Sequence, residues 1–263
     1  MNIVDIPLLN SPWFWLLGIV GVIVTGISKS GFAGGAGVLA VPLLALVIPP
    51  ADAVVLVLPL LLLMDVQTIA RQRRNLDRAQ LLALLPAALL GVGLGSALLD
   101  VLPAAALQWL LGLISITFAG LQWRALRRQP GMTPTTTAPP PRRGPALLAG
   151  VVAGTTSTLI HAGGPPLNMY LARCQLPKAR WIGTAAVFFF SVNVVKVPAY
   201  AVLGLWRPDL LLLAALLIPA GWLGVQLGHR IQQRLSERQF VQVVLVALAG
   251  TGVLLIMKAL GGA

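Results

Sequence analysis

The sequence has few charged residues: they make up only 10% of its 263 residues, whereas hydrophobic residues make up 57%. Soluble domains carry about 25% charged residues. This composition excludes an ordinary soluble domain and indicates a protein that lies within a lipid bilayer. Cysteine is nearly absent as well, because Cys174 is the only one. A single thiol excludes a disulfide framework and a cysteine-rich metal site.

Acidic residues are also scarce: 7 Asp and Glu stand against 19 Lys and Arg, which gives a net charge of +12. A nucleic-acid-binding protein would carry its basic residues on a hydrated face. Here they form short clusters between long apolar runs, so we expect no nucleic-acid partner and interpret the clusters as a topology signal. The N-terminal stretch MNIVDIPLLNSPW holds Asp5 and no basic residue, which does not fit a signal peptide.

Motifs of ATP-driven pumps and of common hydrolases are missing. The chain contains no GxxxxGKS/T loop, no GxSxG and no HExxH, and it has only 2 histidines. We therefore expect no enzymatic activity, no cofactor and no metal. Any transport would be driven by a gradient, by the membrane potential or by a separate partner.

Six apolar runs are long enough to cross a bilayer, which takes about 20 helical residues. Two further stretches, 13–48 and 145–176, are interrupted by glycines. The halves of the second stretch have about 12 or 13 residues, or about 18 Å of helix, which is too short to cross. We therefore expect an all-α, polytopic membrane protein with two broken hairpins and six spans. The spans are residues 52–71, 79–99, 103–123, 181–205, 209–228 and 239–258.

The positive-inside rule tests whether each broken stretch returns to its starting side. If both do, fifteen Lys and Arg collect on one side, and only Arg207 and Lys258 lie on the other. If each stretch crosses once, the division is about eleven to six. The hairpin interpretation therefore wins, and it places the arginine-rich loops in the cytoplasm and both termini outside. The count shows only that each hairpin returns to its starting side. Hairpins of two complete crossings fit it equally well, and only the short arms favour re-entrant hairpins.

The two halves of the chain resemble each other. The motif AGG occurs at 33–35 and at 162–164, and LGVGLG at 90–95 matches LGVQLG at 223–228. This pattern predicts two units, each a hairpin followed by three spans, joined by a flexible cytoplasmic linker. An odd number of crossings inserts the second unit upside down, as an inverted repeat. The units cover residues 1–124 and 144–263, and the linker covers 125–143.

Two pairs of glycines lie within these repeated motifs, Gly91 with Gly95 and Gly224 with Gly228. Each pair is spaced by about one helical turn. Small residues at such spacing let two helices approach closely. We expect these glycines to serve helix packing.

The glycine-rich elements that open the two halves are GISKSGFAGGAGVLAVPLL and GTTSTLIHAGGPPLNMYLA. With the duplication and the size of the chain, they resemble the sulfite exporter TauE/SafE family of small prokaryotic permeases. The resemblance covers nearly the whole chain except the linker. It implies a multi-pass transporter of the bacterial inner membrane that moves a small sulfur-containing or organic anion, such as sulfite, sulfoacetate or a related sulfonate.

The two hairpin breaks form the expected anion site. A helix that begins within the membrane presents unpaired N–H groups and the positive end of its dipole, which bind anions. Pro165 and Pro166 suit the first turn of such a helix, because no N–H is needed there. Arms from opposite faces would aim two such ends at one point. The candidate substrate-binding residues are Ser28, Lys29, Ser30, Gly34, Gly35, Thr156, Ser157, His161, Gly163 and Gly164.

Each of these residues also has a purely structural interpretation. The glycines can serve a tight turn, and the hydroxyl groups can bond the carbonyl of the preceding helical turn. His161 can be a satisfied hydrogen-bonding residue or a proton-linked switch.

Charged residues deep in an apolar run need compensation, because a buried charge costs at least about 2.5 to 3.5 kcal/mol on insertion scales. For Lys29 the compensating group is the substrate anion or Asp65, the acidic residue well inside an apolar run. Asp65 can instead pair with Arg71 at the membrane boundary. Equivalent positions of an inverted repeat face each other, so repeat alignment adds further cavity or coupling residues. The aligned pairs are Asp65 with Asn193 and Gln67 with Lys196.

The leading hypothesis is a secondary transporter that exports a small anion by alternating access of two inverted repeats around a midplane site. An inside-negative potential favours the exit of an anion by about 2.3 kcal/mol per charge per 100 mV. A passive anion channel and an importer of a related anion are the alternatives, and the missing motifs disfavour an intramembrane enzyme. The expected partners are the anion and the lipid bilayer, and a homodimer is left open.

Overall fold

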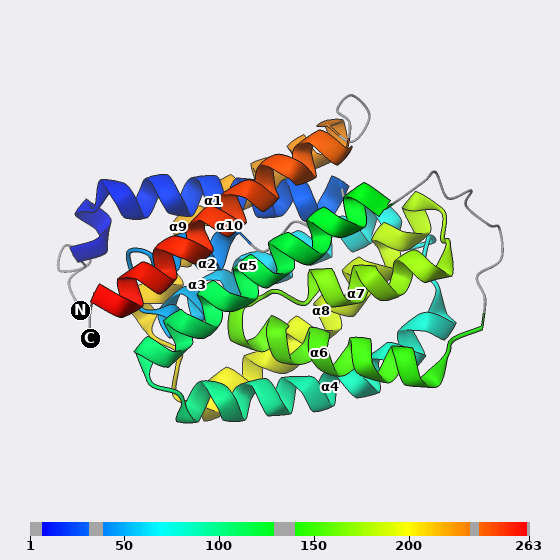
Figure 1. Ribbon diagram of the computed structural model, residues 1–263. Helices are drawn as coiled ribbons and strands as arrows, with labels where there is room; N and C mark the ends of the chain where they lie inside the picture. Colours follow the sequence, from blue (N-terminus) through cyan, green and yellow to red (C-terminus); the bar gives the residue numbers. More distant parts are fainter. Residues whose placement is uncertain (1–6, 32–38, 129–139, 232–236, 262–263) are drawn as a thin grey trace.

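The structure, a computed structural model, describes residues 7–31, 39–128, 140–231 and 237–261 (Figure 1). Within these residues every regular element is a helix. In chain order the helices are η2 (Pro7–Asn10), α1 (Pro12–Gly31), α2 (Ala40–Ala45), α3 (Pro50–Gln72), α4 (Arg78–Val101), α5 (Ala104–Arg128), α6 (Arg143–Ile160), α7 (Gly164–Leu171), η3 (Ala172–Cys174), α8 (Lys178–Val202), α9 (Pro208–Ile231) and α10 (Glu237–Gly261).

Seven helices of the described chain are long and apolar enough to cross a membrane. Six of them correspond to the six predicted spans, and the seventh is α1. Proline begins α3 and α9, where its missing N–H leaves no hydrogen bond unmade. The chain is therefore an all-α polytopic membrane protein, as predicted.

The two broken hairpins have unequal arms, which corrects the prediction of about 12 or 13 residues for both arms of the second hairpin. Its first arm, α6, has 18 residues, and the counterpart α1 has 20. The second arms are short, since α7 has 8 residues and α2 has 6. The prediction fails because α6 continues through its Thr and Ser run and ends only at Ile160. Only the second arms are too short to cross.

The first hairpin returns to the end of the molecule at which it starts. In Figure 1, α1 begins and α10 ends on the same side. There Lys258 of α10 donates to the carbonyl oxygen of Leu46, just after α2, at 2.9 Å. At the same end, Arg207 pairs with Asp52 in the first turn of α3 at 3.1 Å. The start of α1 and the start of α3 therefore lie at one end.

The second hairpin also returns, at the opposite end. The residues just before α6 and the first turn of α8 line one cleft there, together with the loop between α3 and α4. Each hairpin therefore begins and ends at the same end of the molecule, which is the arrangement that the count of Lys and Arg favours. Which end faces the cytoplasm stays a prediction.

The two halves of the chain pack into each other. Helix α1 packs on α9, α6 on α4, α5 on α10 and α3 on α8. In the repeat, α1 corresponds to α6 and α4 corresponds to α9. The contact of α1 with α9 is therefore equivalent to the contact of α6 with α4. The pattern agrees with the predicted duplication, and the inversion stays a prediction. Residues 129–139 of the predicted linker lie outside the described residues.

Glycines allow the closest of these helix contacts. A Cβ atom on Gly91 of α4 would lie 2.2 Å from the carbonyl oxygen of Val151 in α6. One on Gly224 of α9 would lie 2.5 Å from the carbonyl oxygen of Ile23 in α1. No side chain fits at such distances. The predicted packing role of the repeated glycines is confirmed.

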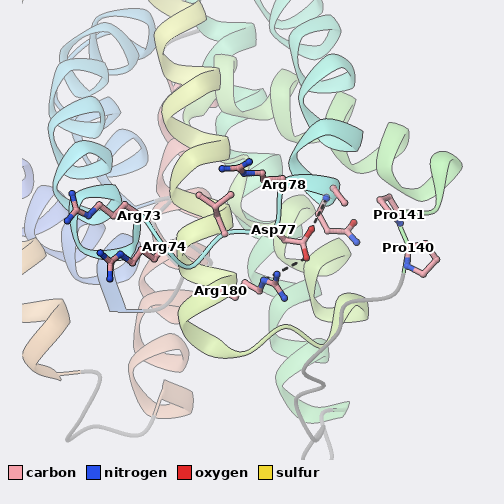
Figure 2. Close-up of a pocket in the computed structure, with 10 residues that line it drawn as sticks. Arg73, Arg74, Asp77, Arg78, Pro140, Pro141 and Arg180 are labelled. Carbon is pink, nitrogen blue, oxygen red and sulfur yellow. Dashed lines mark hydrogen bonds and ion pairs between the residues drawn. The ribbon is translucent and has the colours of Figure 1, made fainter.

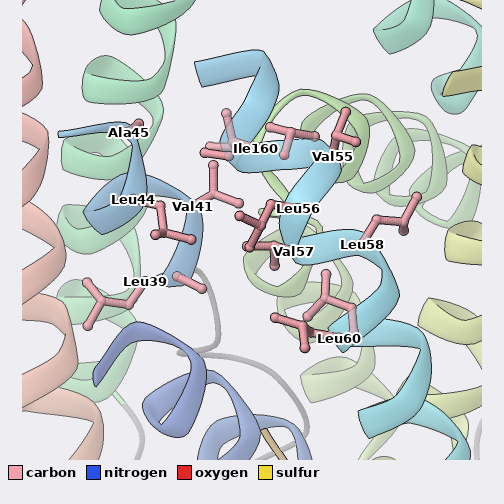
Figure 3. Close-up of a cluster of buried hydrophobic side chains, with 14 of the residues drawn as sticks. Leu39, Val41, Leu44, Ala45, Val55, Leu56, Val57, Leu58, Leu60 and Ile160 are labelled. Carbon is pink, nitrogen blue, oxygen red and sulfur yellow. The ribbon is translucent and has the colours of Figure 1, made fainter. Parts of the chain in front are cut away.

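An apolar cluster fixes the short arm of the first hairpin (Figure 3). It joins Leu44 of α2, Leu56 of α3 and Ile160 at the end of α6, and all three are at most 1% exposed. Inside a bilayer such contacts stabilise through close van der Waals packing, because lipid tails are as apolar as leucine. The cluster therefore holds the ends of α2 and α6 beside α3.

Candidate functional site

Three charged side chains are buried within the candidate spanning helices of the described chain. Lys29 of α1 is 8% exposed, and Asp65 of α3 and Lys196 of α8 are 0% exposed. Charged residues inside a membrane protein are energetically costly and mark functional sites by default. These three side chains therefore define the candidate site.

Asp65 pairs with Lys29 and is itself oriented by Asn193. Lys29 Nζ lies 2.7 Å from Asp65 Oδ1, and the Asn193 amide donates to Asp65 Oδ2 at 2.8 Å. The alternative partner, Arg71, donates instead to the side-chain oxygen of Gln226 at 2.6 Å. Asp65 is therefore the partner of Lys29, and the aligned residues Asp65 and Asn193 face each other as predicted.

Lys196 has three acceptors and, among the described residues, no carboxylate at ion-pair distance. Its ammonium donates to the carbonyl and hydroxyl oxygens of Ser157 at 3.0 and 3.1 Å and to His161 Nδ1 at 2.7 Å. Because Nδ1 accepts, the ring proton is assigned to Nε2, which donates to the carbonyl oxygen of Val54 at 2.8 Å. His161 is neutral in this arrangement, so the groups that Lys196 contacts directly are all neutral.

His161 ends α6 in the left-handed conformation, with φ 56° and ψ 26°. Residues with a Cβ atom rarely adopt this region, and glycine is preferred at such helix ends. The amides of His161 and Ala162 close the turn by donating to the carbonyl oxygens of Ser157 and Thr156 at 2.9 and 3.1 Å. A glycine would close the same turn, but it could not link α6 to α3 and α8 as the imidazole does.

A small cavity of about 20 Å³ lies between these groups. A cavity needs about 10 to 15 Å³ to hold one water molecule, so this one has room for a single water. With both lysines and Asp65 charged, the site carries a net charge of +1, which favours an anion. The cavity is lined by Lys29, Leu61, Ser157, His161, Gly164, Phe189 and Asn193.

The start of α7 borders this cavity. Gly164 lines it, and Pro165 and Pro166 occupy the first turn of α7, as predicted. Gly163 serves packing, because a Cβ atom there would lie 2.7 Å from the carbonyl oxygen of Ala153 in α6. One predicted glycine of this break therefore faces the cavity, and the other keeps α7 close to α6.

Three predicted hydroxyl residues do not line the cavity. The Thr156 hydroxyl bonds carbonyl oxygens of the preceding turn and of the hairpin turn at 2.7 and 3.0 Å. The Ser30 hydroxyl bonds carbonyl oxygens of its own preceding turn and of α9 at 2.9 and 3.0 Å. Ser28 is fully buried. For Thr156 and Ser30 the structural interpretation therefore holds.

Gln67 also stays outside the site, although it aligns with Lys196 in the repeat. It follows Asp65 by two residues, and such positions point to different sides of a helix. Its side chain is half-buried and does not line the cavity. The remaining two predicted residues, Gly34 and Gly35, lie outside the described residues.

Phe189 and Tyr200 are not among the predicted residues, yet both support the site. The Lys29 ammonium lies 4.9 Å from the centroid of the Phe189 ring, which is a cation–π distance. The Tyr200 hydroxyl donates to a carbonyl oxygen of α6 at 2.7 Å. Both residues share one face of α8 with Asn193 and Lys196, and this helical spacing is the signal that identifies them.

A second hollow, the arginine cleft, has a volume of about 760 Å³ and lies at the arginine-rich end (Figure 2). Figure 2 shows its arginines spread along the cleft. Asp77 accepts from the amide of Gln80 at 3.1 Å, which caps α4, and lies only loosely paired with Arg180 at 3.9 Å. The residues that define the cleft include Arg73, Arg74, Arg78 and Arg180, with Pro140 and Pro141 before α6.

Comparison with known proteins identifies a family for this chain. A family model described as sulfite exporter TauE/SafE matches residues 17–255, which include nearly all of both hairpins and of the six spans. No curated protein and no solved structure matches. Because the model matches most of a polytopic helical chain, this protein belongs to the sulfite exporter TauE/SafE family of membrane transporters.

Proposed function

We propose that this transporter exports a small sulfur-containing or organic anion, such as sulfite or a sulfonate, across the bacterial inner membrane. The observation that carries the proposal is that two lysines and one carboxylate share a buried site, which has a net charge of +1 when all three are ionised. An unbalanced buried charge favours the binding of an ion of opposite sign. Sulfite, which the family description names, has that sign.

The donors around the cavity suit an oxyanion. Lys29 supplies charge at the cavity wall, Ser157 supplies a hydroxyl group, and α7 begins at Gly164 with the positive end of its dipole. Lys196 does not line the cavity, but it adds its charge from beside Ser157 and His161. A sulfite or sulfonate group accepts from several donors at once, and charge-assisted hydrogen bonds are about twice as strong as neutral ones. These donors favour an oxyanion over a cation or a neutral solute.

The site must open before such an anion enters. A cavity of about 20 Å³ holds one water molecule, whereas sulfite has four heavy atoms. We infer that the two halves move against each other, so that the site opens to one side at a time. The equivalent helix pairs, α1 with α9 and α6 with α4, support this interpretation because they provide two matching bodies.

The outward direction depends on the predicted orientation. Single cysteines replacing Thr136 and Asn10, in a Cys174→Ala background, can be labelled in intact cells and in inverted vesicles with a membrane-impermeant reagent. We expect the Thr136→Cys label from the cytoplasm and the Asn10→Cys label from outside. Labelling of both from one side would overturn the orientation and the argument for export.

The substrate class is tested by thermal-shift measurements on the purified protein. The panel contains sulfite, thiosulfate, sulfoacetate, taurine and acetate, applied to wild type, Lys29→Ala and the control Lys258→Ala, whose lysine lies near the end of α10. A sulfur oxyanion should stabilise wild type and the control but not Lys29→Ala. Stronger stabilisation by acetate, or a normal response of Lys29→Ala, would contradict the proposal. Flux that fails to saturate in proteoliposomes would indicate a channel.

A further inference from the structure

The two buried lysines are balanced in different ways. Lys29 has an anion from the chain itself, since Asp65 Oδ1 lies 2.7 Å from its ammonium. Among the residues that the structure describes, Lys196 donates only to the neutral acceptors Ser157 and His161. Lys29 therefore has a contacting counter-ion within the protein, whereas Lys196 has none, so the site as a whole keeps an excess positive charge when all three groups are ionised.

Bulk ions and water cannot replace this carboxylate in the closed arrangement. Asp65 is 0% exposed and Lys29 is 8% exposed, and the cavity beside them has room for about one water molecule. Asn193 fixes the second carboxylate oxygen at 2.8 Å. Asp65 is therefore the group that balances Lys29 when no substrate is present.

We propose that Asp65 is the internal counter-ion of Lys29 that lets the empty transporter return between its two orientations, so that the anion is released without obligatory exchange. This inference rests on the proposed anion transport. During a change of orientation the site is closed to both sides, and every unpaired charge in it is removed from water. The form with the least unpaired charge therefore changes orientation most readily.

The charges of the four relevant forms give the expected behaviour. With Asp65 present, the site carries +1 when empty and 0 with a monoanion. With Asn at position 65, it carries +2 when empty and +1 with a monoanion. The loaded variant therefore has the charge of the empty wild type, whereas the empty variant has a charge that the wild type never reaches. Removing the carboxylate should block the return of the empty form much more than the movement of the loaded form.

The test compares two fluxes of radiolabelled sulfite from proteoliposomes at about pH 6, where sulfite is mainly the monoanion, at saturating concentration and clamped membrane potential. One is net efflux into sulfite-free buffer, and the other is exchange against external unlabelled sulfite. In Asp65→Asn the ratio of exchange to net efflux should rise at least about ten-fold. The control is Asp52→Asn, the same substitution on the same helix at a residue that pairs with Arg207, and its ratio should equal that of the wild type.

A binding measurement separates this role from a merely structural one. Folded Asp65→Asn should bind sulfite more tightly than the wild type, because the carboxylate no longer competes for Lys29. An unchanged flux ratio, or a parallel loss of both fluxes with weaker binding, would overturn the proposal.

If Asp65→Asn does not fold, the double variant Lys29→Gln with Asp65→Asn tests the counter-ion role of Asp65. Its empty site again carries +1, so its flux ratio should return to the wild-type value. A ratio raised ten-fold in the double variant would overturn the counter-ion role. A wild type that moves sulfite in neither mode would overturn the proposed function and this role together, whereas failure of the variants alone concerns only Asp65.

Discussion

Helix α3 carries an ion pair at each of two depths, and their surroundings differ. Asp52, in its first turn, pairs with Arg207 at 3.1 Å, and the two side chains are 22% and 53% exposed. Asp65, further along, pairs with Lys29 at 2.7 Å, and the two side chains are 1% and 8% exposed. Water and salt can replace the partner in the outer pair but not in the inner one. An ion pair of the same kind therefore contributes little at the surface, whereas the buried pair depends on both of its partners.

The two depths also differ in the type of cation, which is an arginine in the outer pair and lysine in the inner site. The outer Arg207 donates to both Asp52 and Asp209, and the hydrogen bond that it donates to Asp209 raises the pKa of this guanidinium above its already high usual value. The inner site uses lysines, whose compact ammonium has three donors. Lys196 places all three on acceptors.

The largest expected effect comes from removing the cation of each pair. Lys29→Met leaves Asp65 buried without its partner and should destabilise the protein by about 3 to 5 kcal/mol. Arg207→Met, the matched change at the surface, should cost less than about 1 kcal/mol. Denaturation of both variants in the same detergent measures the difference. Equal losses would show that depth does not distinguish the two pairs.

Replacing the second inner lysine tests the unbalanced charge. Lys196→Met removes the excess charge and should weaken sulfite binding by about 2 kcal/mol or more. The matched change Lys258→Met near the end of α10 should leave affinity unaltered. Titration calorimetry on the purified variants gives both affinities. Unchanged affinity in Lys196→Met would assign the anion to another part of the molecule.

A smaller effect is expected at the turn that ends α6. His161→Gly relieves the left-handed backbone, so it should be about 1 kcal/mol more stable than His161→Ala. Both variants lose the link from α6 to α3 and α8, and both should therefore transport poorly. Thermal unfolding and proteoliposome flux measure the two properties separately. Full flux in His161→Gly would mean that the turn alone matters.

The smallest effect is expected in the arginine cleft. Arg74→Gln should change stability by no more than about 0.5 kcal/mol, because Arg74 is exposed. Its sulfite flux at moderate salt should stay close to that of the wild type. A loss of sulfite flux as large as that of the Lys196→Met variant would extend the functional site to the arginine cleft. Surface and buried cations would then not differ in their effect on transport.

Sequence patterns identify the charged residues that the structure brings together. Lys29 and Asp65 are identifiable because charges deep in apolar runs are rare, and Asn193 follows from its alignment with Asp65. Gln67 lies outside the cavity lining. The alignment offset changes by one residue between the pair Asp65 with Asn193 and the pair Gln67 with Lys196, so Gln67 and Lys196 do not occupy equivalent sides of their helices. Phe189 is not predicted, because an aromatic residue in an apolar run is usually a packing residue. Only the face of the helix on which it lies shows its contact with Lys29.

The lengths of the hairpin arms are less predictable. Thr156 and Thr158 bond carbonyl oxygens of their own preceding turns, so a run that looks like a break remains helical. The actual end depends on the left-handed turn at His161 and on its contacts with α3 and α8, which local sequence does not encode. Length prediction therefore fails where distant contacts decide the end of a helix.

The interlocked packing of the halves has a consequence for synthesis of the protein. Helices α4 and α5 are translated before α6 and α10, the helices that will cover them. Until those arrive, the groove around Gly91 faces lipid or a membrane chaperone. A gene divided at the linker should consequently yield two fragments that are degraded when expressed singly and survive when co-expressed.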